Sequence, residues 1–105
     1  MLDKLKGLIK NKLLIKNATQ GNITAVRDAL ENGADVNARD IGVAPVTALA
    51  AASIEGHTEI VKLLIEKGAD VNAKGSRFFY GTAYTNAILG SHTEIAKLLK
   101  EKGAK

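Results

Sequence analysis

Cysteine is absent from this chain of 105 residues, tryptophan is absent as well, and proline occurs once. Without cysteine the chain can form no disulfide, no thiolate-ligated zinc site and no cysteine nucleophile. No stretch of about 18 residues lacks a charged side chain, so no segment is typical of a membrane-spanning helix. Lysines also interrupt the apolar residues near the N-terminus, which leaves no continuous apolar region of a secretory signal. These absences favour the cytoplasm, although a lack of cysteine does not exclude secretion.

Charge of one sign is concentrated at one end of the chain. Residues 1–16 hold five lysines and one aspartate, which gives +4, and this equals the formal net charge of the whole protein. Residues 17–105 then carry 10 basic and 10 acidic side chains. A neutral body lacks the spread basic face of a nucleic-acid-binding protein. The sequence therefore predicts no nucleic-acid partner.

The hydrophobic fraction of 46% and the charged fraction of 25% are those of an ordinary folded domain. At this length a single domain over residues 1–105 is expected.

An internal repeat organises most of the chain. The string Ala-Asp-Val-Asn-Ala occupies 34–38 and returns at 69–73, displaced by 35 residues. The same displacement relates His-Thr-Glu-Ile at 57–60 to the same string at 92–95. We infer a capping repeat over about 1–39, a middle repeat over about 40–74 and a C-terminal capping repeat over about 75–105. Such repeats stack into a solenoid.

Each repeat is predicted to contain two short helices. In the middle repeat Gly56 separates a segment of small residues from a wide apolar stripe at 60–65. Gly68 then supplies a left-handed C-terminal cap, and Thr58 or His57 begins the second helix. No repeat could bury both faces of its helices alone, so stacking is required for stability.

Polar residues replace apolar ones in the outer repeats. Asp28 takes the place of Leu63 in the first repeat, and Lys100 takes the place of Ile65 in the last. Ala96, smaller than its equivalent Val61, is expected to face water in the same way. These changes are typical of capping repeats.

The residues from Thr47 to Ala73 closely resemble the ankyrin repeat, and the resemblance extends over about 90 residues. It implies an all-α solenoid of stacked helix pairs with elongated β-turn fingers and a concave face. Two departures are visible. The histidine of the family's Thr-Pro-Leu-His string is missing at 47–50 and at 82–85, so the joints between repeats are expected to be looser or differently bonded. Two extra residues per repeat fall in each finger. The near-consensus second helices are equally typical of a natural and of an engineered protein.

The fingers are unusually apolar for exposed loops, and the second contains three of the four aromatic residues. Aromatic residues and arginine are enriched at binding hot spots. By alignment to the family, Ile54 and Leu89 are exposed apolar residues on the concave face. Alternatively, Phe78 or Phe79 folds back under its finger as part of the core. The candidate partner-binding residues are Val43, Val46, Ile54, Arg77, Phe78, Phe79, Tyr80 and Leu89.

No catalytic, cofactor-binding or metal site is predicted. His57 and His92 are the only histidines, and their equivalent repeat positions place them about 8–10 Å apart, too far to share one metal ion. We expect each to cap the start of a second helix. The Asp-Val-Asn strings at 35–37 and 70–72 look like paired metal ligands, but the family resemblance assigns them to the turn between repeats. No phosphate loop, zinc-protease or hydrolase string is present.

The leading hypothesis is a non-enzymatic scaffold that binds another protein through the apolar fingers and the concave helix face. The alternative is a homo-oligomer assembled through the same fingers. A weaker alternative concerns the N-terminal segment, where leucines recur at helical spacings among the lysines. Such a helix is expected either to lie on an anionic membrane surface or, more simply, to act as a solubilising cap, with a kink at Gly7.

Overall fold

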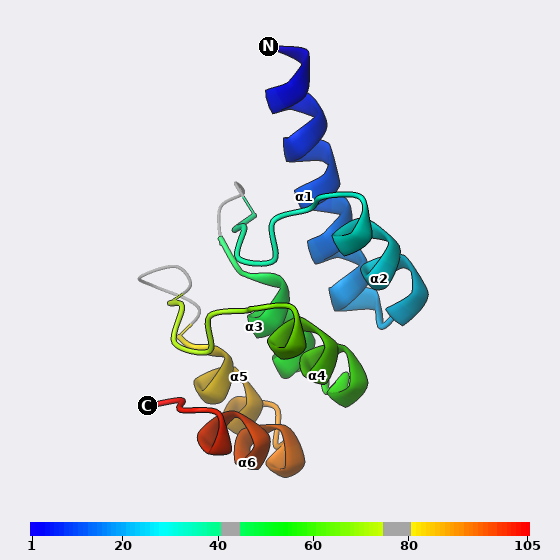
Figure 1. Ribbon diagram of the computed structural model, residues 1–105. Helices are drawn as coiled ribbons and strands as arrows, with labels where there is room; N and C mark the ends of the chain where they lie inside the picture. Colours follow the sequence, from blue (N-terminus) through cyan, green and yellow to red (C-terminus); the bar gives the residue numbers. More distant parts are fainter. Residues whose placement is uncertain (41–44, 75–80) are drawn as a thin grey trace.

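Six helices form three stacked pairs in the computed structural model, which describes residues 1–40, 45–74 and 81–105 (Figure 1). Within each pair the two helices lie side by side, and the pairs follow one another in chain order (Figure 1). Across these residues the structure contains no strand and one isolated antiparallel bridge, between Arg39 and Thr47. The prediction of an all-α solenoid is confirmed. The helices are α1 (Leu2–Gln20), α2 (Ile23–Glu31), α3 (Ala48–Glu55), α4 (Thr58–Glu66), α5 (Ala83–Leu89) and α6 (Thr93–Glu101).

Short polar side chains fix where three of the helices begin. Thr47 and Thr82 precede α3 and α5, and the hydroxyl oxygen of each accepts a hydrogen bond from the backbone N–H three residues later, at 3.1 and 3.3 Å. Asn22 caps α2 in the same way. These bonds satisfy backbone donors that have no partner inside the helix.

Glycines end the helices of the middle repeat, as predicted. Gly56 follows α3 with a φ of 80°, and Gly68 comes just after α4 with a φ of 95°. Beyond Gly68, the N–H of Ala69 donates to the carbonyl oxygen of Leu64 at 2.9 Å, which closes the left-handed end of the helix. A side chain at either position would have to adopt a conformation that L-residues rarely take.

The core runs along the stack between the inner helices α1, α3, α5 and the outer helices α2, α4, α6. Small residues let the inner helices approach closely: Ala48, Ala52 and Ala87 are fully buried. Larger apolar side chains from both layers fill the space between them. The largest of these fully buried side chains are Leu14, Leu49, Ile60, Leu64, Ile95, Leu99, Val26 and Val61.

A ladder of asparagines joins the turns of successive repeats. The side-chain oxygen of Asn37 accepts from the N–H of Asp70 at 2.7 Å, and its amide nitrogen donates to the carbonyl of Gly68 at 3.3 Å. Asn72 makes the equivalent pair of bonds with the N–H of Lys105 and the carbonyl of Gly103. Within each turn the aspartate two residues earlier accepts from the asparagine N–H at 2.9 Å. The assignment of these strings to the turns is confirmed.

The two histidines stand at the N-cap positions of α4 and α6, as predicted, but their side chains join repeats instead of capping these helices. Neither His57 nor His92 makes a side-chain cap bond at the start of α4 or α6. Instead Nε2 of His57 lies 3.0 Å from the carbonyl oxygen of Thr19, and Nε2 of His92 lies 3.0 Å from that of Ile54. A carbonyl can only accept, so Nε2 donates. Each ring therefore binds the end of the preceding inner helix. The joints between repeats are thus bonded differently from those made by the family's Thr-Pro-Leu-His histidine, which is one of the two outcomes expected from the sequence.

The outer repeats follow the capping pattern in part. Asp28 and Lys100 are exposed, and the ammonium of Lys100 lies 4.8 Å from the ring centre of Tyr84. Ala96 is buried, so the expectation that it faces water is wrong.

The first helix extends well beyond the stack (Figure 1). It is continuous from Leu2 to Gln20 and passes through Gly7, so Gly7 does not interrupt it. Only Leu14, Ile15 and Ala18 of this helix are buried. None of the helices in the described ranges combines the length and the apolar character needed to cross a membrane.

Candidate functional site

Three of the predicted partner-binding residues lie in the part of the chain that the structure describes. Leu89, near the end of α5, is 69% exposed. Ile54, at the end of α3, is half-buried, so the expectation that it is exposed holds only in part. Val46 is half-buried and packs against the core. The other five predictions, Val43, Arg77, Phe78, Phe79 and Tyr80, fall outside the described residues, as do both alternatives for Phe78 and Phe79.

The base of the first finger is closed by backbone contacts. The N–H of Asp40 donates to the carbonyl of Val46 at 3.0 Å, next to the bridge between Arg39 and Thr47. This bond fixes the position of Val46 at the point where the chain returns to α3.

Ile88 and Leu89 are neighbours with different surroundings. The residues equivalent to Ile88 in the other repeats, Ala18 and Ser53, are fully buried. Ile88 itself is 52% exposed, because none of the helices in the described ranges packs over it. Leu89 instead belongs to the row of Thr19 and Ile54, whose carbonyl groups bind the histidines. The two exposed side chains therefore face different directions.

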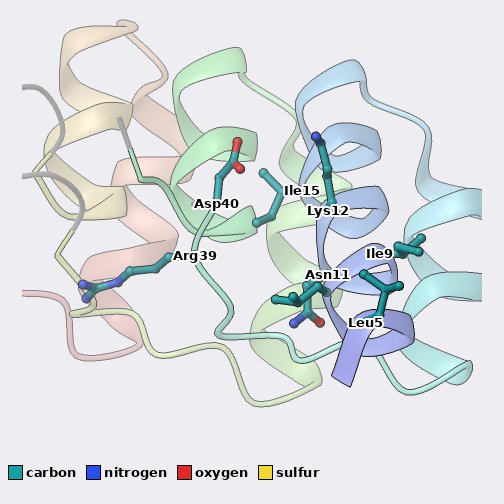
Figure 2. Close-up of a pocket in the computed structure, with 8 residues that line it drawn as sticks. Leu5, Ile9, Asn11, Lys12, Ile15, Arg39 and Asp40 are labelled. Carbon is teal, nitrogen blue, oxygen red and sulfur yellow. The ribbon is translucent and has the colours of Figure 1, made fainter. Parts of the chain in front are cut away.

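A groove that was not predicted from the sequence runs along α1. One wall is α1 and the other is the segment of Arg39 and Asp40 (Figure 2). The first part of the groove has a volume of about 230 Å³. The buried side chain of Ile15 lies between the backbone of α1 and Asp40. The residues that line this part are Leu5, Leu8, Ile9, Asn11, Lys12, Ile15, Arg39 and Asp40.

The groove continues toward the end of α1. A second hollow of about 270 Å³ shares Lys12, Ile15 and Asp40 with the first and extends to Lys16 and Val46. The leucine spacing in the sequence indicated an amphipathic helix here. What it could not indicate is that the finger base folds back to face that helix.

In the described ranges no three histidine, aspartate or glutamate side chains gather around a common point where a metal ion could bind. Asp35 and Asp70 close turns, and both histidines bind backbone carbonyls.

Comparison with known families gives one finding. The family model for ankyrin repeats, in three copies, matches residues 12–105. The chain belongs to the ankyrin repeat family. Ankyrin repeats generally mediate protein–protein interactions. A comparison with proteins of curated function gave no match.

The ankyrin match begins at Lys12, one residue beyond Asn11, which accepts from the N–H of Asp35 at 2.7 Å. Asn11 thus makes the first contact of the ladder that Asn37 and Asn72 continue. The helical turns before it, with Leu5, Leu8 and Ile9, precede the ankyrin match and add a wall to the groove.

Proposed function

We propose that this ankyrin stack is a non-enzymatic scaffold that binds another protein through its fingers and concave face. The binding surface comprises Val43, Val46, Ile54, Arg77, Phe78, Phe79, Tyr80 and Leu89. Protein binding is the general role of the family, and these residues are where we propose that it occurs on this chain.

The exposure of Leu89 is the observation that carries the proposal. A large apolar side chain stands 69% exposed at the end of α5, in the row that the family alignment places on the concave face. The aromatic finger at 78–80 precedes the same helix in sequence. Apolar and aromatic side chains gathered on one surface are typical of a protein-binding site.

The hydrogen bonds made by the two histidines support a function without catalysis. A general base or nucleophile must be available to a substrate. His57 and His92 instead bind carbonyl groups through Nε2. We therefore assign the scaffold no cofactor, metal ion or reaction.

The adjacent pair at the end of α5 supplies a matched test. The wild type, Leu89→Gln and Ile88→Gln are each immobilised, and the proteins that each chain retains are compared. The two changes remove exposed apolar side chains of similar size from the same helix but from different faces. We expect a partner retained by the wild type and by Ile88→Gln to be lost, or strongly depleted, with Leu89→Gln. Equal retention by all three chains, with unchanged circular dichroism, would refute this binding surface.

Self-association is the second candidate. In this alternative two copies associate through the same apolar fingers in a two-fold contact, and the exposed side chains of Ile88 and Leu89 supply further apolar surface on α5. In that case the solution mass rises with concentration, and Ile88→Gln weakens the dimer as much as Leu89→Gln does.

A tether to an anionic membrane is a weaker candidate. The N-terminal half of α1 exposes leucines among its lysines, as an interfacial helix does. Sedimentation with anionic and neutral vesicles tests it, and equal pelleting with both would rule out an electrostatic tether.

A further inference from the structure

The first helix carries two apolar faces, of which the stack uses one. Leu14, Ile15 and Ala18 point into the core. At 100° per residue, the row formed by Leu2, Leu5, Ile9 and Leu13 lies about 180° around the helix from that buried face. All four side chains are exposed. The fold of the repeats therefore does not explain this second face.

Two residues of the second face, Leu5 and Ile9, line the groove together with Leu8, which lies between the two faces. At spacings of three and four these residues make a ridge on α1, opposite Arg39 and Asp40. The residues that line both parts of the groove run along α1 from Leu5 to Gln20, about 22 Å at 1.5 Å per residue. Ridges with this spacing pack between the side chains of a second helix.

Positive charge predominates along the groove. Lys12 and Lys16 line it against the single carboxylate of Asp40, a sum of +1, while Arg39 lines it with its guanidinium group pointing away from α1 (Figure 2). The one ion pair within the described ranges joins Glu59 and Lys62, far along the chain, so none there neutralises these cations. Lys4, Lys6 and Lys10 add charge in the preceding turns.

We propose that this groove docks an acidic amphipathic helix of a partner protein. The apolar residues of that helix pack on Leu5, Leu8 and Ile9, and its carboxylates face Lys12 and Lys16. Charge selects this occupant over a second copy of the chain, because two copies would bring two segments of +4 together.

Shape selects a protein segment over a membrane. A bilayer surface is flat on the scale of one helix, whereas the wall of Arg39 and Asp40 makes this site concave (Figure 2). A membrane would also engage Leu13, which lies outside the groove, as readily as Leu8.

This inference goes beyond the proposed function and stands without it. It concerns α1 and the finger base and shares Val46 with the proposed scaffold surface, but the scaffold is tested at Leu89, which does not line the groove. The two can therefore fail separately.

The probe is a synthetic peptide of about 15 residues, long enough to follow the groove. Its leucines recur at positions i, i+3, i+4 and i+7, on one face of the helix, and its other positions are glutamate. The ends are blocked, and the peptide carries a fluorescent label. Binding to the full chain is measured by fluorescence anisotropy. The control peptides are a scrambled sequence of the same composition and the same pattern with lysine for glutamate.

The chain offers matched control variants. Leu8 is 50% exposed inside the groove, and Leu13 is 47% exposed about 140° around the same helix. We expect Leu8→Gln to weaken peptide binding about tenfold and Leu13→Gln to change it less than about twofold. For charge, Lys12→Glu with Lys16→Glu should weaken binding more than Lys4→Glu with Lys6→Glu, and added salt should weaken it further.

Several results would overturn the proposal. These are the absence of saturable binding, equal affinity for the scrambled peptide, and equal effects of Leu8→Gln and Leu13→Gln. Pelleting with phosphatidylserine vesicles that Leu8→Gln and Leu13→Gln reduce alike would point to a membrane instead. A concentration-dependent dimer that Leu8→Gln abolishes would point to a second copy. Leu89→Gln should leave peptide affinity unchanged, which separates this outcome from failure of the scaffold proposal.

Discussion

The imidazole of His92 donates from Nε2 to the carbonyl oxygen of Ile54 at 3.0 Å, and His57 makes the same bond to Thr19 one repeat earlier. In both cases the acceptor lies in the last turn of an inner helix, where carbonyl groups have no partner within the helix. The space for the ring depends on glycine, because a Cβ at Gly56 would come within 2.5 Å of His92. The histidines thus set the spacing between neighbouring repeats.

Removal of this bond should destabilise the stack. We expect His92→Ala to lower the free energy of unfolding by about 1–2 kcal/mol, because it leaves the carbonyl of Ile54 without its partner and removes the ring contacts. Urea unfolding followed by circular dichroism measures the change. Lys97→Ala, at an exposed position of α6, serves as the control. If both variants unfold like the wild type, the histidine does not hold the joint.

Ser91 occupies a backbone conformation that favours glycine. Its φ is 61°, and the equivalent residues in the first two repeats are Gly21 and Gly56, with φ values of 82° and 80°. Ser91→Gly should stabilise the protein by about 0.5 kcal/mol, since relief of the left-handed conformation exceeds the extra entropy of the unfolded glycine. Ser91→Val should destabilise it, because a β-branched residue fits this region poorly. Thermal unfolding of the two variants tests the order, and a Ser91→Val protein as stable as Ser91→Gly would contradict it.

Asn37 joins the first and second turns with two bonds of different kinds. Asn37→Ala removes both and should lower the free energy of unfolding by about 1–2 kcal/mol. Asn37→Asp keeps an acceptor for the N–H of Asp70 but loses the donor to Gly68, so we expect an intermediate loss. Chemical denaturation of the three proteins gives the ranking. Asn37→Asp at least as unstable as Asn37→Ala would contradict this ranking.

Asn86 is fully buried, and neither atom of its amide group has a hydrogen-bond partner among residues 1–40, 45–74 and 81–105. The equivalent residue of the middle repeat is Ala51. An unpaired buried amide is unfavourable, and an apolar side chain of similar shape avoids the penalty. Asn86→Leu should therefore raise the free energy of unfolding by about 1 kcal/mol, measured by thermal unfolding. A lower melting temperature than that of the wild type would show that the amide is satisfied in solution.

The fold could be predicted from the sequence because the same turn and helix patterns recur in successive repeats. Gly56, Gly68 and the Asp-Val-Asn strings each mark a turn at a fixed distance from an apolar stripe, and the structure has those turns. The role of the histidines could not be predicted in the same way. Their position next to a helix start suggests a cap, whereas their bonds reach residues 38 positions away.

The candidate site was predictable only in part for a related reason. Alignment to the ankyrin family predicted that Leu89 is exposed, and it is. Half-burial of Ile54 and Val46 depends on how closely neighbouring helices and the finger base pack, which no local pattern reports. The groove on α1 likewise arises from two segments that are more than 20 residues apart.

The most direct test of the scaffold account is the solution molar mass, measured by size-exclusion chromatography with light scattering over a wide concentration range. The wild type is compared with the triple variant Phe78→Ala, Phe79→Ala, Tyr80→Ala. The account predicts a monomer at every concentration for both chains, of 11.1 kDa for the wild type, which leaves the fingers available to a different protein. A dimer or larger species in the wild type that the triple variant abolishes would contradict it, because the fingers would then bind a second copy of the same chain.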